Sequence, residues 1–525
     1  MRGFTNVTRR VWRGFLLACL FAVAAGAASP LLAAEAPLSA GANDRVTIAT
    51  NAEPDTLDML TSVFPPISYV VLRNIAEMLW GYNLDGTVRP TVASWERSPD
   101  GKIVTFHLHP GIKFHSGDEL VADDVLFSFD RMKKNTPAFM RHARLVKSIE
   151  KLDKYTVRFT WDRPDVTLFD GMQLFLGSKA YHDRVGEKIF MTQPSGIGPY
   201  RLTKYAPGQY IDLVAFDGYY GIKPAIKAAR FYIVKDDETR VAKLRAGEAD
   251  IIMNAPYPEV KPLEDEGFTV LKYPANPTVS VVFDLLTPQS PWHKLKVRQA
   301  IAHAIDADAI VKGLFHGIPE RYPMLAPGEE GYDPMMKFPT FDPALAKRLM
   351  VEAGYPNGFK MPLYFNGTSF YGFRQAAEAV SLYLKAIGID CEMHNIEAVQ
   401  GLHQARRAQT DHSIELVTIG ALPIANTGLT PIDMLTISFR SSAPSVVSHF
   451  PEVDSGIEAA LAEPDPTKRA VIIRRVTNFL HDQVATITLW DSVSVYAMKK
   501  GITYTPIAHR MPFMLLKNVK VAAKS

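Results

Sequence analysis

Two hydrophobic patterns alternate along the chain after residue 44. Short runs with β-branched residues or strict alternation predict strands, and longer runs with apolar residues three and four positions apart predict helices. Neither pattern dominates, and both occur over the whole length, which favours an α/β fold. The strand predictions are Arg45 to Thr50, Val104 to His109, Tyr155 to Trp161, Arg230 to Val234, Ser280 to Phe283, Glu415 to Ile419 and Thr486 to Leu489.

One predicted helix has clear start and stop signals. Asp342 can accept hydrogen bonds from the free amides of the first turn, and Pro343 suits the first helical position. Gly354 can end the helix in a left-handed conformation. The buried face is predicted to contain Leu345, Leu349 and Met350.

Two further helices follow from the same reasoning. One runs from about Thr467 to Asp482 after Asp465 and Pro466, with a buried stripe of Val471, Ile472, Val476, Phe479 and Leu480. The other ends at Gly388 and has Ala377, Val380, Leu384 and Ile387 on one side. Both faces are interpreted as core.

The N-terminal segment is predicted to be a secretory signal peptide. Four arginines, at positions 2, 9, 10 and 13, precede an uncharged run from Gly14 to Ala34. Cleavage near Ala34 removes these four charges and no acid, so the formal charge changes from +3 to −1. A nucleic-acid partner is therefore not expected. Sec and twin-arginine export both remain open, and the mature protein is expected in the periplasm.

Cysteine use is minimal. Cys19 lies within the signal segment and resembles a lipid-attachment site, although a soluble mature form is favoured because Arg13 leaves a short apolar stretch before it. Only Cys391 remains after cleavage, so no intramolecular disulfide can form.

Motifs for catalysis and metal binding are missing from the sequence. It contains no phosphate-binding loop, nucleophile elbow, His-Glu-x-x-His or EF-hand motif. His107 and His109 would project from one face of a strand, but Thr105 shares that face and Val104, Phe106 and Leu108 occupy the other. A solvated strand face is favoured over a metal site. No catalytic residue, metal or cofactor is expected, and the protein is not expected to be an enzyme.

Several motifs together resemble the family 5 extracellular solute-binding proteins of ABC importers, which include dipeptide-, oligopeptide- and nickel-binding proteins. They occur in the family's order across nearly the whole mature chain. The motifs are Glu53 to Asp58, Gly86 to Pro90, Ala93 to Glu96, Phe106 to Gly117 with Ala122 to Ser128, Gly196 to Tyr200, Leu244 to Asp250 and Val297 to Asp306.

The resemblance implies a two-lobed periplasmic binding protein fold, type II-like, with an additional subdomain and two hinge crossings. Lobe I would hold residues 41–85, 190–274 and 493–525, with the additional subdomain at 86–189. Lobe II would hold residues 275–492. The crossings would fall near Tyr273 to Pro277 and Leu489 to Ser492.

The resemblance also suggests ligand contacts between the lobes. Arg374 lies where dipeptide binders place a carboxylate-binding arginine, and a solvated arginine at a helix start is the alternative. Trp490 and Tyr496 can stack on a planar or sugar-like ligand, or can pack in the hinge and core. Ile197 replaces the family's usual threonine in a loop near the cleft, and Glu53 is either a contact or a surface residue.

One departure from the family bears on the ligand. Peptide binders carry an acidic residue in a Trp-x-x-Asp-like segment of the second lobe, whereas residues 416–426 contain no acid. Burying a peptide's ammonium group without a partner would cost several kcal/mol. An ordinary peptide with a free amino terminus is therefore disfavoured, unless Glu415 or Asp433 takes over this role.

The function expected from the sequence is capture of a small organic solute and its delivery to permease subunits in the inner membrane. The solute would be peptide-like, an opine or modified amino acid, or a glycoside. The protein is expected to act as a monomer without a nucleic-acid partner. The alternatives are a secreted hydrolase acting on peptides or sugars, and a binding protein that reports to a membrane sensor.

Overall fold

A computed structural model describes most of the chain after residue 43. The described residues are 44–51, 53–62, 70–135, 145–162, 164, 168–171, 173–273, 278–367, 372–396, 417–422, 430–443, 446–508 and 514–522. The predicted signal peptide, including Cys19, lies outside them. Within these ranges, every helix is too short or too polar to cross a membrane.

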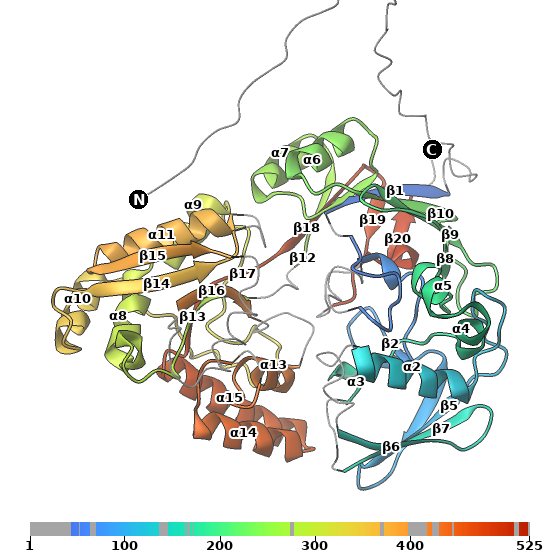
Figure 1. Cartoon of the computed structure of the whole chain (residues 1–525). Helices are drawn as coiled ribbons and strands as arrows, with labels where there is room; N and C mark the ends of the chain where they lie inside the picture. Colours follow the sequence, from blue (N-terminus) through green and yellow to red (C-terminus); the bar gives the residue numbers. More distant parts are fainter. Residues whose placement is uncertain are drawn as a thin grey trace, which may run out of the picture. The chain divides into compact units, whose positions relative to one another are not determined.

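A seven-stranded sheet combines segments from both ends of the chain (Figure 1). β1 is parallel to β10 and β11, and the other neighbouring pairs are antiparallel. The strands, in spatial order, are β12 (Thr269–Tyr273), β18 (Ser494–Met498), β11 (Ile251–Met253), β1 (Arg45–Thr50), β10 (Ala228–Ile233), β9 (Tyr210–Ala215) and β8 (Tyr200–Ala206). The helices in this part are α4 (Lys179–Val185), α5 (Glu187–Thr192), α6 (Asp237–Arg245) and α7 (Val260–Asp265).

A four-stranded antiparallel sheet lies between β1 and β8 in the sequence. Its spatial order is β4 (Ala93–Arg97), β5 (Ile103–Leu108), β7 (Thr156–Trp161) and β6 (Val146–Lys151), and α2 (Ala122–Asn135) packs against β6 and β7. The short pair β2 (Trp80–Tyr82) and β3 (Val88–Pro90) precedes it, and α3 (Leu168–Gly171) follows it.

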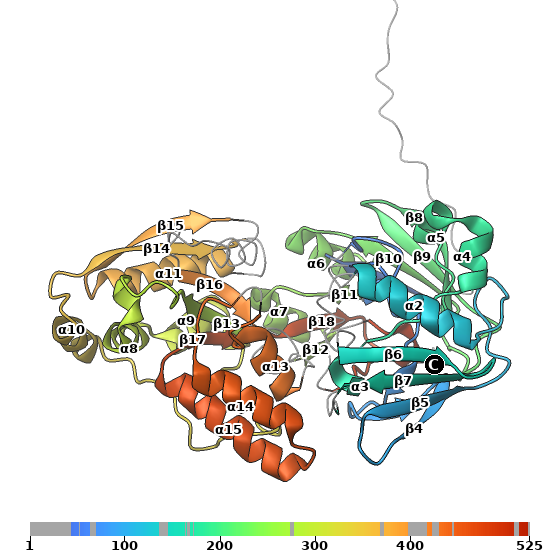
Figure 2. The same ribbon diagram turned by 60° about the horizontal axis from the view of Figure 1, so that its bottom comes forward.

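A five-stranded mixed sheet is formed by residues 278–491. Its spatial order is β15 (Ile389–Asn395), β14 (Phe359–Phe365), β16 (Val417–Leu422), β13 (Thr278–Phe283) and β17 (Thr486–Asp491). Its helices include α8 (Leu295–Ala304), α9 (Ala307–Leu314), α10 (Pro343–Glu352), α11 (Phe373–Lys385) and α13 (Pro431–Ser438). Two longer helices, α14 (Pro451–Ala462) and α15 (Pro466–Asp482), pack side by side (Figure 2).

The chain passes between the seven- and five-stranded sheets twice. β12 ends at Tyr273 in the first sheet and β13 begins at Thr278 in the second. The return is shorter, because β17 ends at Asp491 and β18 begins at Ser494. The remaining strands β19 (Ile502–Tyr504) and β20 (Val519–Val521) form a separate two-stranded pair.

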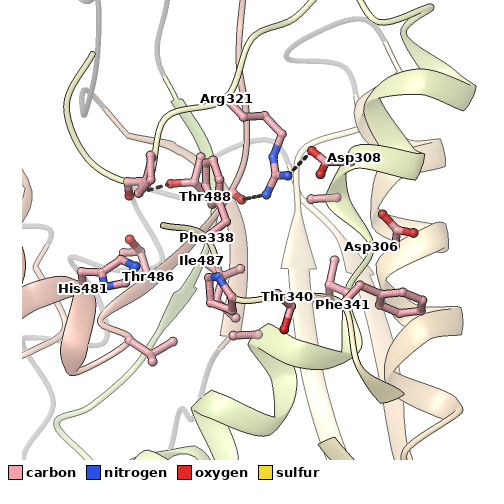
Figure 3. Close-up of a pocket in the computed structure, with 16 residues that line it drawn as sticks. Asp306, Asp308, Arg321, Phe338, Thr340, Phe341, His481, Thr486, Ile487 and Thr488 are labelled. Atoms are coloured by element: carbon pink, nitrogen blue, oxygen red, sulfur yellow. Dashed lines mark hydrogen bonds and ion pairs between the residues drawn. The ribbon is translucent and has the colours of Figure 1, made fainter. Parts of the chain in front are cut away.

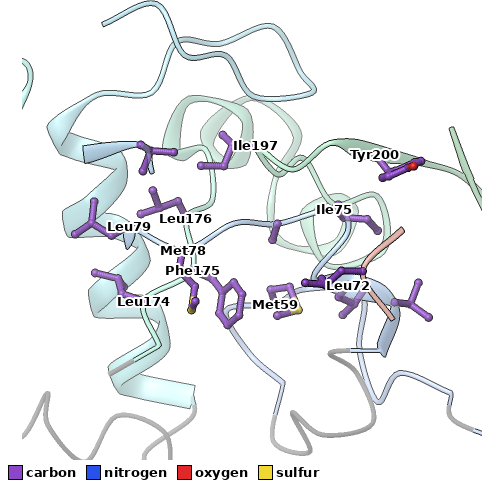
Figure 4. Packing of buried hydrophobic residues seen from close by; sticks show 14 of the residues in the cluster. Met59, Leu72, Ile75, Met78, Leu79, Leu174, Phe175, Leu176, Ile197 and Tyr200 are labelled. Atoms are coloured by element: carbon purple, nitrogen blue, oxygen red, sulfur yellow. The ribbon is translucent and has the colours of Figure 1, made fainter. Parts of the chain in front are cut away.

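The buried apolar side chains of the described residues form three clusters. The first underlies the seven- and four-stranded sheets, and Figure 4 shows part of it around Met59, Ile75 and Phe175. The second joins α6 and α7 to the five-stranded sheet and its helices. The third lies among α13, α14 and α15.

The predicted helix signals are largely confirmed. Asp342 accepts a 2.8 Å hydrogen bond from the Leu345 amide at the start of α10, and Gly354 has φ +91° after its end. In α11, the predicted face is buried, and Gly388 has φ +90°. The prediction for α15 was wrong at Val471, which is 65% exposed, while Ile473 is fully buried in the third core cluster. The buried stripe therefore follows Ile473, Val476 and Leu480, which are three and four positions apart.

The predicted strand face of β5 is confirmed for its histidines and wrong for Thr105. Val104, Phe106 and Leu108 are buried, and His107 and His109 are exposed. Thr105 is 9% exposed, although it lies on the same strand face as His107 and His109.

Candidate ligand-binding site

Parallel strands in both sheets end at edges where polar residues gather. In open α/β sheets, ligands bind at the carboxyl ends of the strands. β1, β10 and β11 share this direction in the seven-stranded sheet, as do β14, β15 and β16 in the five-stranded sheet. The residues that directly follow these strands are therefore the candidates for ligand contact.

At the first edge, two asparagines join neighbouring strands. Asn51 follows β1 and Asn254 follows β11, and both are exposed. The Asn254 side-chain amide donates a 2.9 Å hydrogen bond to Oδ1 of Asn51. The Ser494 hydroxyl, at the start of β18, donates to Oδ1 of Asn254 at 3.4 Å. The three side chains form a hydrogen-bonding group where the chain returns from the five-stranded sheet.

A buried arginine fixes the backbone beneath this edge. Arg240 on α6 is 1% exposed, and its guanidinium donates to four backbone carbonyls in the loops after β10 and β11. The acceptors are Val234, Lys235, Met253 and Asn254, at 2.8 to 3.2 Å. The planar guanidinium can satisfy several carbonyls at once, so the two loops are held together.

At the second edge, Arg374 is exposed at the start of α11. Its guanidinium carbon lies 5.9 Å from the ring centroid of Phe365, the last residue of β14. Asn395, the last residue of β15, accepts a 2.8 Å hydrogen bond from the Gly367 amide. This edge thus presents an exposed cation beside a neutral amide, which suits an anionic or polar ligand group.

Glu53 follows the first edge and is bound to the β8–β9 hairpin. Its Oε1 accepts hydrogen bonds from the Tyr205 hydroxyl at 2.9 Å and from the Gly208 amide at 2.6 Å. Burial, and then the nearby Glu53 carboxylate, raise the pKa of Tyr205 to about 12. The Glu53 side chain therefore connects the segment after β1 to a distant hairpin.

Trp490 is packed inside the second core cluster. Its side chain is 1% exposed, and its ring centroid lies 4.7 Å from that of Phe315 and 5.9 Å from that of Phe373. Phe373 directly precedes Arg374, so the packing of Trp490 supports the helix start that carries the exposed arginine.

Tyr496 belongs to the first core cluster. On β18 it lies between Met253 of β11 and Leu271 of β12 and is fully buried. Its hydroxyl has no hydrogen-bond partner among the described residues, and burial raises its pKa well above the usual value. In this structure, its side chain is part of the packing of the first sheet.

Ile197 lies between two glycines that approach another backbone segment closely. A Cβ on Gly196 would lie 2.1 Å from the Ile75 carbonyl oxygen, and one on Gly198 would lie 2.5 Å from that of Asn74. The close approach permits hydrogen bonds to this segment and places Ile197 in the first core cluster with no exposed surface (Figure 4).

The five predicted contacts thus occupy different environments. Arg374 and Trp490 are connected through Phe373, whereas Tyr496 and Ile197 lie in the first core cluster and Glu53 in a neighbouring hydrogen-bond network. The proposed substitutes for the missing acid are not brought to either edge by the described contacts: Asp433 is fully buried in α13, and Glu415 lies outside the described residues. Residues 416 and 423–426 of the acid-free segment also lie outside them.

The sequence reasoning missed the asparagines at the two edges. The available signal was an amide residue at or directly after the end of a predicted strand, as in Ile-Ala-Thr-Asn ending at Asn51. Among the described residues, no group of three or more histidine, cysteine or acidic side chains is arranged to hold a metal ion.

Two crossings between sheets, with polar strand ends on both, define a two-lobed periplasmic binding protein. The chain belongs to the bacterial extracellular solute-binding proteins, family 5, whose middle region matches residues 87–441. This family consists of substrate-binding proteins of ABC importers rather than enzymes, and its members are periplasmic. The resemblance found in the motifs is therefore confirmed.

Individual relatives agree with this assignment. The dipeptide-binding protein of Escherichia coli K12 is 27% identical over 452 residues, covering 78% of this chain and 81% of the relative. A periplasmic binding protein from Helicobacter pylori in complex with the peptide STSA has a TM-score of 0.79 at 24% identity, covering 91% of this chain and 98% of that chain. A protein from A. tumefaciens R10 in complex with agropinic acid has a TM-score of 0.76 at 25% identity, covering 92% and 99%.

Proposed function

We propose that the protein encloses one small organic solute between its two lobes and delivers it to permease subunits of an ABC importer in the inner membrane. The observation that carries this proposal is that each of the two sheets has a carboxyl edge, where its parallel strands end beside polar residues. Asn51 and Asn254 lie at the carboxyl edge of the seven-stranded sheet, and Arg374 lies at that of the five-stranded sheet. A ligand that contacts both edges would favour the closed state by its differential affinity.

The lobes are assigned as follows. Lobe I comprises residues 41–85, 190–274 and 493–525, with the additional subdomain at 86–189, and lobe II comprises residues 275–492. The seven-stranded sheet then belongs to lobe I and the five-stranded sheet to lobe II. Each lobe would move largely as a body, with the hinge at the two passages of the chain between the sheets.

The ligand class follows from the charges at the edges. Arg374 offers a bidentate donor for a carboxylate, and the asparagines offer neutral amides for hydroxyl, amide or carboxyl groups. Asp491 ends β17 at the second edge, but it is 2% exposed and its oxygens accept hydrogen bonds from Thr278 and Tyr322, so it offers no free carboxylate to a peptide ammonium group. We therefore favour an anionic, modified amino acid of the opine type, as in the relative bound to agropinic acid, over an unmodified peptide.

Of the predicted contacts, Arg374 remains the first choice. Trp490 is assigned a supporting role through Phe373 and Arg374, because its own ring is buried. Ile197, Tyr496 and Glu53 stay secondary candidates, since a ligand would reach the first two only after rearrangement of the core.

Mass spectrometry of the molecule released from natively purified protein by mild denaturation tests the ligand class. We expect an anionic small molecule that rebinds the emptied protein with micromolar or tighter affinity in calorimetry and makes the particle more compact in X-ray scattering. Tight binding of several unmodified di- and tripeptides, or scattering unchanged by the released molecule, would contradict the proposal.

A pair of arginine variants tests the contact itself. Arg374→Ala should weaken binding of the released molecule at least about tenfold, or about 1.4 kcal/mol, because a charge-assisted hydrogen-bond pair is lost. Arg348→Ala is the matched control, since Arg348 is an exposed arginine on α10. Equal affinities of the two variants would remove Arg374 from the site.

A further inference from the structure

A cavity of about 340 Å³ lies within the part of the chain that forms the five-stranded sheet (Figure 3). Its lining comes from the end of α8, the start of α9, residues 321–323 and 338–341, the end of α15 and β17. No residue of the seven-stranded sheet contributes to it. The cavity is therefore separate from the two carboxyl edges, and its volume falls at the lower end of the range for small-molecule sites.

Asp306 is the lining acid that no described basic side chain pairs with. Asp306 caps α9 by accepting a 2.9 Å hydrogen bond from the Ala309 amide through Oδ1, and no described residue donates to its Oδ2. The hydroxyls of Thr340 and Thr486 likewise have no partner among the described residues. Figure 3 shows Asp306 on the α9 side of the cavity and Thr486 on the β17 side.

The one arginine in the lining is ion-paired with a neighbour, although its buried Nε donor has no partner among the described residues. Arg321 pairs with the carboxylate of Asp308 and donates to the Thr488 carbonyl at 3.1 Å. Its guanidinium carbon also lies 4.1 Å from the ring centroid of Phe338. With this pair neutral, the Asp306 carboxylate leaves the cavity with a net negative charge. A cationic ligand is favoured over an anionic one.

The remaining wall is apolar. The cavity is lined by the apolar side chains of Ile305, Val484 and Ile487. Phe341 also lines it, and 46% of the Phe341 surface is exposed. Val484 has φ +45°, which is strained for a β-branched residue. Arg298 holds this conformation by donating to the Val484 carbonyl at 3.2 Å and to the preceding carbonyl of Gln483 at 2.7 Å. The strained turn thus contributes an apolar side chain to the cavity lining.

We propose that this cavity is a second ligand site, which takes a small molecule with one ammonium group and an apolar, ring-sized body. The ammonium group would bind the Asp306 carboxylate. The body would pack on Ile305, Val484 and Ile487, with Phe341 covering it. The site is independent of the solute bound between the lobes, because none of its lining residues lies at either carboxyl edge.

Ligand-observed NMR with the purified full chain tests this site, using phenethylamine as the probe and 3-phenylpropionate as the probe of opposite charge. We expect saturable binding of the amine in the micromolar to low millimolar range and at least about tenfold weaker binding of the carboxylate. A crystal structure with the amine should place its nitrogen within hydrogen-bond distance of Asp306. Absence of saturable amine binding, or equal binding of both probes, would overturn the proposal.

Two variants separate the site from general charge effects. Asp306→Ser keeps a helix-capping oxygen but removes the charge, so it should weaken amine binding about tenfold without unfolding α9. The same change in another cap, Asp342→Ser at α10, should leave amine binding unchanged. Ala302→Leu, which adds volume to a lining residue, should reduce binding with Asp306 intact. Amine affinity unchanged in both Asp306→Ser and Ala302→Leu would place the binding elsewhere and overturn the assignment.

Discussion

The side chain of Asn254 donates a 2.9 Å hydrogen bond to Asn51, although the two residues are 203 positions apart. The bond joins the ends of β11 and β1, which are parallel neighbours in the seven-stranded sheet. Asn254 has φ +52°, a left-handed conformation that asparagine tolerates better than most residues. Its backbone conformation and its side-chain hydrogen bond therefore both contribute to the structure of this edge.

Substitutions at Asn254 should separate these two contributions. Asn254→Gly removes the hydrogen bond but accepts the left-handed backbone, and should lower the free energy of unfolding by about 1 kcal/mol. Asn254→Ala removes the bond and adds about 1–2 kcal/mol of backbone strain. Denaturant unfolding should rank the wild type above the glycine variant and the glycine variant above the alanine variant. An alanine variant as stable as the wild type would contradict the strain argument.

Removing the Tyr496 hydroxyl should not destabilise the protein. The hydroxyl is buried and has no partner among the described residues, so Tyr496→Phe removes a desolvated polar group. We expect an unchanged or higher free energy of unfolding and unchanged affinity for the released ligand. Tyr200→Phe is the contrasting control, because the equally buried Tyr200 hydroxyl donates to the Ile226 carbonyl at 3.0 Å. A large loss of affinity in Tyr496→Phe alone would return Tyr496 to the ligand site.

Stability should depend on pH through Asp491, at the end of β17. Its side chain accepts hydrogen bonds from the Thr278 hydroxyl and, at 2.8 Å, from the Tyr322 amide. Burial, with a smaller contribution from Glu329, raises its pKa to about 7. Because an unfolded aspartate has a pKa of about 3.9, the folded state binds more protons between pH 4 and 7. The stability that this residue contributes is present below about pH 4 and is lost as pH rises through 7.

Asp491→Asn should remove this dependence, because asparagine does not ionise. Unfolding midpoints measured from pH 5 to 8 should show the variant gaining stability relative to the wild type as pH rises. Asp482→Asn is the control, since the Asp482 side chain is 78% exposed. Parallel curves for Asp491→Asn and the wild type would show that this carboxyl group titrates normally.

Two glycine substitutions should have opposite effects on stability. Gly196→Ala would place a Cβ 2.1 Å from a backbone oxygen, and the resulting displacement should cost about 1–3 kcal/mol or more. Gly313 lies inside α9 with no atom within 4 Å of a built Cβ, so Gly313→Ala should stabilise by about 0.5–1 kcal/mol. Thermal unfolding measures both. A tolerated alanine at position 196 would show that residues 74–76 can move away.

Local chemistry was the part of the fold most readily predicted from sequence. Helix starts and ends depend on interactions between residues a few positions apart, as in the caps at Asp342 and Asp465 and the turn at Gly388. The local sequence is therefore enough to predict them. Val471 shows the limit of this reasoning. Hydrophobicity alone assigns several neighbouring apolar residues of α15 to the buried face. The packing of α15 against α14 determines which of them are buried.

The candidate site was predictable only in part, because it depends on strand order. Arg374 was chosen from its position in the family pattern, but the pairing of Asn51 with Asn254 requires that β1 lie beside β11. The strained Val484 depends similarly on Arg298, which is far away in the sequence. Aromatic residues such as Trp490 carry no sequence signal that separates ligand stacking from core packing, and only its burial shows the contacts it makes.

The position of β18 has a consequence for how the molecule assembles. This strand, residues 494–498, pairs with β11 on one side and β12 on the other, so it fills an interior place in the seven-stranded sheet. During synthesis, β1, β10 and β11 emerge more than 200 residues before it. The seven-stranded sheet therefore keeps two unpaired strand edges, on β11 and β12, until residues 494–498 arrive. A chain arrested before Ser494 would expose these edges to chaperones, proteases and other nascent copies.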